Sequence, residues 1–348
     1  MYIVSEPNYA TTNWYRSCID ALKNQARRKR VTLTFAQQPQ EAAGEHCVFV
    51  LGASVVWLRE TVAALQETGA HPILLNELPD YPFVGRYSCV KTDYGRFMSM
   101  ASARFSQDGR RRTAFYGMNR ASFSDISRKN AFEGCFTDGE VFENNGSLKT
   151  CFETFYHAHQ REPFDAVICA NDFAAVSLHR HLIDAACKDD ICIAVHSNAQ
   201  LLTYFPAVVS FGIDYGAVAA AAFEIADCMN ANPNFSGMRV TVEPLAEAQT
   251  ERVEPPVRAP HGEESNYDAI YMDAELAELM RIEKLLSSCD ETDLRILQML
   301  SQADNTIGES TFLSDNGVKY RIKKMKKICS VTSKSEIPPM LKKYGIEI

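Results

Sequence analysis

The sequence lacks the short motifs that mark most phosphate-handling and hydrolytic enzymes. It contains no GxxxxGK(S/T) phosphate loop, no GxSxG nucleophile motif, and no histidine or cysteine cluster with the spacing of a metal site. The polar residues that stand at its predicted strand ends suit hydrogen bonding rather than nucleophilic chemistry. We therefore expect a binding protein rather than an enzyme, with no cofactor and no metal.

Closely spaced cysteine pairs are also absent, although the chain has 11 cysteines. The two nearest in sequence, Cys187 and Cys192, do not form a CxxC pair. Others, such as Cys89 and Cys169, lie within apolar runs. This usage favours small buried thiols in a reducing cytosol over disulfides or zinc ligands.

Signals for export and for membrane insertion are missing as well. The first residues, Met-Tyr-Ile-Val-Ser-Glu-Pro-Asn, provide neither the basic segment nor the apolar segment of a signal peptide. No apolar run approaches the roughly 20 residues that span a bilayer. We therefore expect a cytoplasmic protein with no membrane partner.

The composition is ordinary for a soluble globular protein, with 46% hydrophobic and 23% charged residues in a chain of 348. This length suits one to three domains and a large core. The net charge of -8 argues against nonspecific nucleic-acid binding by the chain as a whole. A single basic module remains compatible with that charge.

A short apolar run at 166–170 ends at Asn171 and Asp172 and is followed by apolar residues at helical spacing. This pattern predicts a strand and a helix with two polar side chains at the strand's carboxyl end, where open α/β sheets bind small molecules. An ordinary helix cap explains the two residues equally well. Elsewhere, strand-like and helix-like segments alternate at short intervals, which predicts βαβ units and a parallel sheet.

Four segments carry recognisable motifs in a fixed order: a Val-x-x-Asp step with a following glycine, an Arg-x-x-Ala-aromatic motif, a strand ending in Ala-Asn-Asp, and a strand followed by Asp-aromatic. They lie at 88–95, 127–132, 166–172 and 208–216. Together they resemble the ligand-binding domain of LacI/GalR-type repressors and type I periplasmic sugar-binding proteins, which have glycine where this chain has Ala131. The resemblance covers 1–250 and implies an α/β fold of two lobes, each a parallel sheet flanked by helices.

The resemblance also implies how the chain is divided between the lobes. Lobe 1 is expected at about 1–117 and 213–236, and lobe 2 at about 118–212 and 237–250. The composition then changes, because 251–265 is rich in proline and charge and therefore indicates a linker.

Seven side chains are expected in the cleft between the lobes by the same resemblance. They are Trp14, Tyr15, Asp93, Arg128, Asn171, Asn198 and Tyr215. In the relatives, aromatic rings stack on sugar faces and the arginine donates to ligand hydroxyls. Three alternatives stay open: Trp14 could fasten its helix to the core, Asp93 could only cap a helix, and Arg128 could form a surface ion pair. Asn198 replaces an aspartate of many relatives and brings no charge.

The segment 266–288 is expected to form a connecting or dimerisation helix, which runs from about Tyr267 to Ser288. Apolar residues recur there at roughly heptad spacing. The seam is short. It is therefore compatible with a dimer coil and also with packing on a neighbouring domain.

The last segment, 289–348, resembles a LuxR-type helix-turn-helix, mainly over 313–336. Gly317 stands where that pattern has threonine, and Pro338-Pro339 is expected to disrupt its usual fourth helix. Independently of the resemblance, one helix face is apolar and the other is lined by lysine and arginine. The apolar positions are Val318, Ile322, Met325 and Cys329. Such a helix suits docking in a major groove.

The expected DNA contacts follow from this helix. They are Asn316, Lys319, Arg321, Lys323 and Lys327. We expect Lys319 and Arg321 nearest the base edges or adjacent phosphates, and the later lysines mostly at phosphates.

These features predict a homodimeric transcription regulator that binds double-stranded DNA and a small polar effector, with a sugar as the first expectation. Closure of the lobes on the effector would change the spacing of two DNA-binding modules. The alternative is a cytoplasmic small-molecule-binding protein whose basic C-terminal module docks a protein partner rather than DNA. Activation and repression are equally open.

Overall fold

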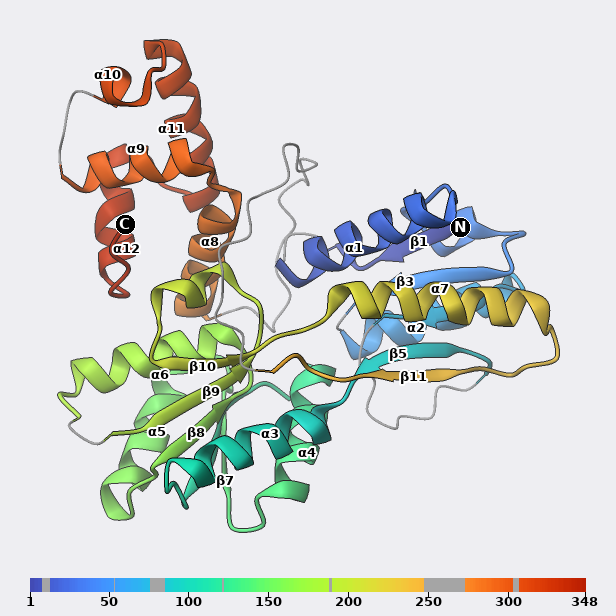
Figure 1. The fold of residues 1–348 in the computed structure, drawn as a ribbon, viewed down its shortest axis with the longest axis horizontal. Coiled ribbons are helices and arrows are strands. Elements are labelled where there is room, and N and C mark those ends of the chain that lie inside the picture. Colours follow the sequence, from blue (N-terminus) through green and yellow to red (C-terminus); the bar gives the residue numbers. More distant parts are fainter. Residues whose placement is uncertain are drawn as a thin grey trace.

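The computed structural model is shown in Figure 1. It describes residues 1–7, 13–52, 54–75, 85–120, 122–187, 190–246, 273–302 and 307–348. The linker predicted at 251–265 and the start of the helix predicted from 266 lie outside the described residues.

The first lobe is built on a six-stranded parallel sheet in the order β11-β5-β4-β3-β1-β2. Its strands are β1 (Tyr2–Ser5), β2 (Thr34–Ala36), β3 (Cys47–Leu51), β4 (His71–Leu74), β5 (Ser88–Thr92) and β11 (Arg239–Val242). Alternation along β3 places Phe49 against the helices of one face and Val48 and Val50 against the other. One face is covered by α1 (Asn13–Lys29) and α7 (Tyr215–Ala231), and the other by α2 (Val55–Glu67) with the short η2 (Pro39–Ala42) beside it.

The second lobe is built on a five-stranded parallel sheet in the order β10-β9-β8-β6-β7. Its strands are β6 (Thr113–Met118), β7 (Glu140–Glu143), β8 (Ala166–Cys169), β9 (Cys192–His196) and β10 (Val208–Phe211). One face packs on α3 (Tyr94–Gln107) and α4 (Phe123–Cys135), and the other on α5 (Leu148–Arg161) and α6 (Asp172–Asp184). A short η3 (Gln200–Tyr204) follows β9.

The structure corrects two lobe boundaries expected from the sequence. Strand β11 pairs with β5 in the first sheet, so the segment that contains it does not belong to the second lobe. Helix α3 and strand β6 belong to the second lobe, because Phe97 and Phe105 are buried with Phe115 in its core. The physical reason is that edge strand β5 needs a partner, and β11 supplies it.

The C-terminal module is entirely helical. It comprises α8 (Ala274–Ser288), α9 (Glu291–Ser301), α10 (Ile307–Thr311), α11 (Asp315–Cys329), η5 (Lys334–Glu336) and α12 (Ile337–Lys342). Contrary to the sequence expectation, Pro338 and Pro339 do not disrupt the last helix. They stand in its first turn, where backbone N–H groups have no intrahelical partner and proline costs little.

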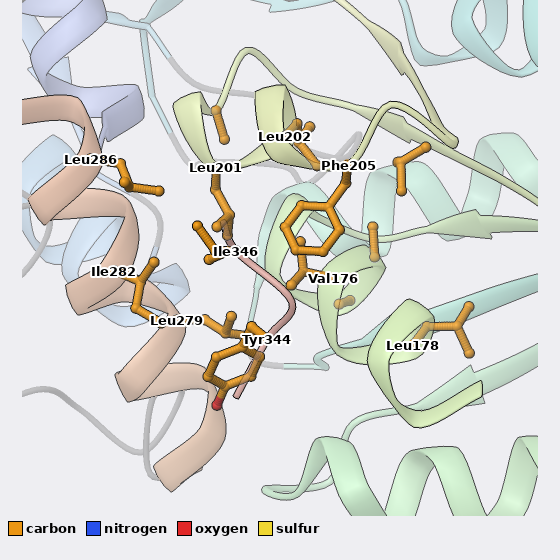
Figure 2. Close-up of a cluster of buried hydrophobic side chains, with 14 of the residues drawn as sticks. Val176, Leu178, Leu201, Leu202, Phe205, Leu279, Ile282, Leu286, Tyr344 and Ile346 are labelled. Atoms are coloured by element: carbon orange, nitrogen blue, oxygen red, sulfur yellow. The ribbon is translucent and has the colours of Figure 1, made fainter. Parts of the chain in front are cut away.

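The apolar seam of α8 is buried inside the chain, and the helix therefore cannot offer that seam to a second copy. Leu279, Ile282 and Leu285 are fully buried. They belong to a continuous core that joins the α5/α6 face of the second lobe to the helical module (Figure 2). Of the two roles that the sequence left open for this helix, the structure shows packing on a neighbouring domain rather than a dimer coil.

Polar contacts reinforce this docking. The Asp273 carboxylate accepts from the backbone N–H of Leu148 at the start of α5, and Glu275 accepts from His181 of α6 at 3.1 Å. Arg180 of α6 also donates to Glu275, at 3.4 Å. The module is therefore fixed to the second lobe by apolar and polar contacts together.

Among the helices of the described residues, none combines the length and the apolar character that a bilayer crossing requires. All the cysteines are free thiols.

Candidate ligand cleft and nucleic-acid interface

A cavity of about 430 Å³ lies between the two lobes. The carboxyl ends of β5, β6, β8 and β9 open toward it, together with the first turns of α1, α6 and α7. Five of the seven side chains expected from the sequence line it: Trp14, Arg128, Asn171, Asn198 and Tyr215. Arg128 and Asn171, from different elements, thus face one cavity. Its position matches the crevice at which open α/β sheets bind ligands.

Asn171 and Asp172 have different roles, which the sequence could not assign: one caps α6 and the other faces the cavity with its carboxylate. Asn171 Oδ1 accepts from the N–H of Ala174 at 2.9 Å and caps α6. The Asp172 carboxylate faces the cavity and has no hydrogen bond or ion pair to another residue of the described chain. Burial raises the pKa of Asp172 to about 6, against the opposing effects of its own backbone N–H and Arg128. The Asp172 carboxylate is therefore able to accept hydrogen bonds from a molecule in the cavity.

Gly117 allows α6 to start this close to the sheet. It stands at the end of β6 with a φ of +82°, and a Cβ added there would lie 2.5 Å from the Ala174 Cβ. The close approach of β6 and α6 brings Asp172 to the cavity wall.

Arg128 is held at the cavity by its neighbours. Its Nη1 donates to Asp125 Oδ1 at 3.2 Å, and its guanidinium lies over the Tyr94 ring at 4.7 Å from the centroid. Burial raises the pKa of Asp125 to about 6, with Arg128 acting in the opposite direction. The ion pair that the sequence left open exists, but it lies inside the cleft, where only 12% of the Arg128 side chain is exposed.

His196, at the end of β9, is a buried wall of the same cavity. Burial lowers its pKa to about 3, and the charge of Arg128 adds to this effect. The ring packs against Tyr94 and Phe97. It is therefore uncharged near neutral pH and contributes shape rather than charge.

Asn198 lines the cavity but its amide is already used. Nδ2 donates to the carbonyl of Ile213 at 3.1 Å, and Oδ1 accepts from the N–H of the same residue. Both bonds fix the strand that leads from β10 to α7. The structure thus gives Asn198 a positioning role at a crossing between the lobes, in place of an aspartate that could bind ligand.

Two expected residues do not line the cavity. Tyr15 Oη is hydrogen-bonded to Ser5 Oγ at 3.2 Å. Asp93 Oδ1 accepts from the N–H of Arg96 at 2.8 Å and caps α3, which is the alternative that the sequence left open. Tyr215 does line the cavity, and burial raises its pKa well above the ordinary value.

The sequence did not single out Arg16 and Glu283, which also line the cavity. Arg16 Nε and Nη2 are buried and have no hydrogen-bond partner within the described chain. Glu283 accepts from the N–H groups of Gln200 at 3.1 Å and Leu201 at 2.6 Å. A signal for Glu283 was present, because its spacing from Leu279 and Leu286 puts a carboxylate on the apolar face of α8.

Glu283→Gln should make stability less dependent on pH between about pH 4.5 and 8. Burial raises the pKa of Glu283 from 4.5 to about 8, and the Asp172 charge adds to this. The unfolded chain therefore releases this proton at lower pH than the folded protein does. The contribution of Glu283 to the free energy of unfolding is therefore lost as pH rises through this window. Glutamine does not titrate, so the variant does not lose stability in this way.

The measurement is urea unfolding of both proteins at several pH values across that window. The difference in unfolding free energy between them should change steadily as pH rises. A constant difference would contradict the raised pKa.

Helix α11 presents a basic surface. Ser314 Oγ accepts from the N–H of Gly317 at 3.2 Å and caps it, while Val318, Met325 and Cys329 are buried. The exposed side chains on the other side are Asn316, Lys319, Tyr320, Lys323, Lys324 and Lys327. Tyr320, which the sequence did not single out, is 69% exposed.

Arg321 is turned away from this surface, contrary to its expected place nearest the base edges or adjacent phosphates. Its Nη1 lies 2.8 Å from Asp290 Oδ2 and 2.7 Å from Asp293 Oδ1, at the start of α9. The two carboxylates hold the guanidinium between α11 and α9. Lys327 also differs from the other lysines, because it borders the ligand cavity.

Comparison with known proteins gives a fold rather than a family. No family model matches the chain, and no curated protein matches it. A LacI family transcriptional regulator from Enterococcus faecalis V583 with bound ribose covers 70% of this chain and 95% of its own, at 15% identity and a TM-score of 0.56. The lobes adopt the type I periplasmic-binding-protein fold.

Two other solved structures agree. The Lac repressor bound to ONPG covers 70% of this chain and 80% of its own, at 11% identity and a TM-score of 0.56. The periplasmic binding protein of the arabinose ABC transporter from Shewanella sp. ANA-3, bound to L-arabinofuranose, covers 71% of this chain and 92% of its own. The identity is 13% and the TM-score is 0.53. By their descriptions, these three proteins are regulators and a binding protein. Within the described residues, no group of three His, Cys, Asp or Glu side chains is placed to hold a metal ion.

Proposed function

We propose that this protein is a ligand-responsive transcription regulator, which binds a small polar effector between its lobes and DNA through its C-terminal module. The observation that carries the proposal is a cavity lined from both lobes in a chain that also has an exposed basic helix. Structures of the same fold that hold ribose and arabinofuranose support a sugar as the effector.

The side chains in the cleft suit a sugar. The Asp172 carboxylate can accept from two hydroxyls, and the buried guanidiniums of Arg16 and Arg128 can donate to sugar oxygens. The rings of Trp14 and Tyr215 add apolar surface for the C–H faces of a pyranose or furanose. A thermal-shift screen with pentoses, hexoses, disaccharides and cyclitols tests this, because a ligand at 100 times its Kd stabilises the folded state by about 2.7 kcal/mol.

We further propose a homodimer, because two modules on matched half-sites give a specificity that one module lacks. The contact has to use a surface other than the α8 seam, which is buried within the chain. Light scattering with and without duplex DNA tests this. A monomer in both conditions at micromolar concentration would rule the dimer out.

The DNA-facing part of α11 is proposed to be its first two exposed turns. Asn316, Lys319, Tyr320 and Lys323 are exposed there, and an amide, two cations and a phenol can serve base edges and phosphates. Arg321 is left out, because Asp290 and Asp293 hold its guanidinium.

Lys319→Ala and Lys323→Ala should each weaken binding to any duplex DNA and reduce the salt slope of log K by about 1. Each lysine is exposed and can release one counterion when it meets a phosphate. The measurement is fluorescence anisotropy with a labelled duplex at several salt concentrations.

Lys149→Ala is the matched control, since this exposed lysine lies on α5 of the second lobe, away from α11 in Figure 1. It should bind like the unchanged protein. If both α11 variants also bind like the unchanged protein, the helix does not contact DNA. The basic module would then serve a protein partner, the alternative function.

A further inference from the structure

The ligand cavity has a third wall, formed by the C-terminal module. Besides the two lobes, α8 contributes side chains at intervals of one helical turn. They are Leu276, Ala277, Met280, Arg281, Glu283 and Lys284. These positions form a strip along the helix that faces the cavity, next to the seam that packs on the second lobe.

Charges from three parts of the chain meet at this wall. Arg16 belongs to α1 of the first lobe, Asp172 to α6 of the second lobe, and Glu283 to α8. Glu283 and Arg16 interact electrostatically, as do Glu283 and Asp172. Asp172 interacts in turn with Arg128. Burial raises the pKa of Glu283 to about 8, so this side chain is mostly uncharged near neutral pH. Arginine side chains and the Asp172 carboxylate still border the cavity together, so a ligand with a net charge would meet a like charge there.

The docking of the module gives this wall a defined position. Glu283 accepts the N–H groups of Gln200 and Leu201, which start η3 in the second lobe. The core around Ile282 continues into the same lobe (Figure 2). The first lobe meets α8 across the cavity, where α1 contacts it. A molecule in the cavity would thus lie between the first lobe and the module.

We propose that the effector touches α8 itself, so that the first helix of the C-terminal module is part of the effector site. The occupant is a neutral polyhydroxyl compound, held between Arg16, Asp172 and the strip of α8 around Ala277 and Glu283. This inference rests on the proposed function of the cleft. It makes the module a direct sensor of the ligand, because a filled cavity changes how α8 meets the first lobe.

A matched pair of substitutions on α8 tests the contact. Ala277 lines the cavity, whereas Ala274 is exposed on the same helix. Full-length Ala277→Met and Ala274→Met proteins are titrated by calorimetry with D-ribose, L-arabinose, myo-inositol, cellobiose and lactose. If the ligand touches α8, the first variant should bind about tenfold more weakly or worse, because the longer methionine side chain would occupy space that the ligand needs. The second should stay within about twofold.

Two further variants separate the possible failures. Asp172→Asn tests the cleft without touching α8, and Glu283→Gln tests the α8 wall with little change in volume. Weaker sugar binding in Asp172→Asn, Ala277→Met and Glu283→Gln together supports the proposal. Circular dichroism and the unfolding midpoint establish whether each variant is folded. If Ala277→Met does not fold, sugar binding by Glu283→Gln decides whether the effector touches α8.

Two outcomes overturn the inference in different ways. If Asp172→Asn loses sugar binding while Ala277→Met and Glu283→Gln bind like the unchanged protein, the effector occupies the cleft without touching α8. If none of the sugars binds the unchanged protein, or Asp172→Asn has no effect, the proposed sugar site itself fails.

Discussion

Leu279→Asp should detach the C-terminal module from the second lobe and lower the free energy of unfolding of that unit by more than about 4 kcal/mol. Leu279 is fully buried in the core shared by α8, α6 and η3. A carboxylate there loses its water and finds no cation among the apolar side chains drawn around it in Figure 2. Replacing the leucine also removes an apolar side chain from the core that it shares with Val176 and Leu201 of the second lobe.

The measurement combines urea unfolding with limited proteolysis of the full chain. The unchanged protein should protect α8 and unfold the second lobe and the module in one transition, because they share one core. The variant should release the module at lower urea and expose α8 to protease. Ala274→Asp is the control, since it places the same carboxylate at an exposed position in the first turn of α8, where the helix dipole favours it.

A result in which Leu279→Asp leaves stability and protection unchanged would mean that the seam of α8 is free. The dimer coil suggested by heptad spacing would then regain support. A concentration-dependent unfolding midpoint that Leu279→Asp abolishes would point in the same direction.

Arg321→Ala should destabilise the C-terminal module by about 3 kcal/mol. Its guanidinium is paired with Asp290 and Asp293, and only 4% of the Asp293 side chain is exposed. Removing the cation leaves that carboxylate buried and unpaired, which costs more than the loss of an exposed pair. DNA binding should fall only in conditions where the module is unfolded.

The readout is the unfolding midpoint together with duplex binding at a temperature where the variant is folded. Arg321→Lys keeps the positive charge but loses the planar guanidinium. Its stability should therefore lie between that of the unchanged protein and that of Arg321→Ala. Adding Asp293→Asn to Arg321→Ala should recover part of the loss, because the charge that remains unpaired, on Asp290, is about half exposed to water. A fully stable Arg321→Ala protein with altered base preference would instead place Arg321 at the bases, as the sequence suggested.

The proposed effector site and the proposed DNA-binding surface are close to each other through α8 and α11. Glu283 lies at the cavity on one helix, and Lys327 borders the same cavity from the other. The module is fixed to the second lobe, so closure of the first lobe would act on a unit that already carries α11. Coupling between effector and DNA would therefore be transmitted within one chain, in addition to any change of spacing in a dimer.

The local elements follow from the sequence because each has its own pattern. The apolar run at 166–170 with its polar end predicts β8 and the start of α6, and both are present. The apolar positions Val318 and Met325 predict the buried side of α11, which is also present. Periods of two and of 3.6 residues depend only on neighbours within one element.

Which charged side chains meet could not be inferred in the same way. Arg321 looks like part of a basic surface until Asp290 and Asp293, about thirty positions earlier, are brought next to it. Arg16 and Glu283 lie far apart in sequence and meet only in the cavity. Asp93 and Asn171 look alike as helix caps, yet only Asn171 lines the cleft.

The sequence by itself determined the alternation of strands and helices, the parallel sheets, the polar strand ends and the amphipathic basic helix. The tertiary structure decided that β11 completes the first sheet, that α8 packs on the second lobe, and that Glu283 of α8 lines the cleft while the Asn198 amide is used by Ile213. The physical reason is that periodicity shows which face of an element is apolar. Periodicity does not show which other element will pack against that apolar face. The partners of a buried charge are therefore set only when the elements pack together.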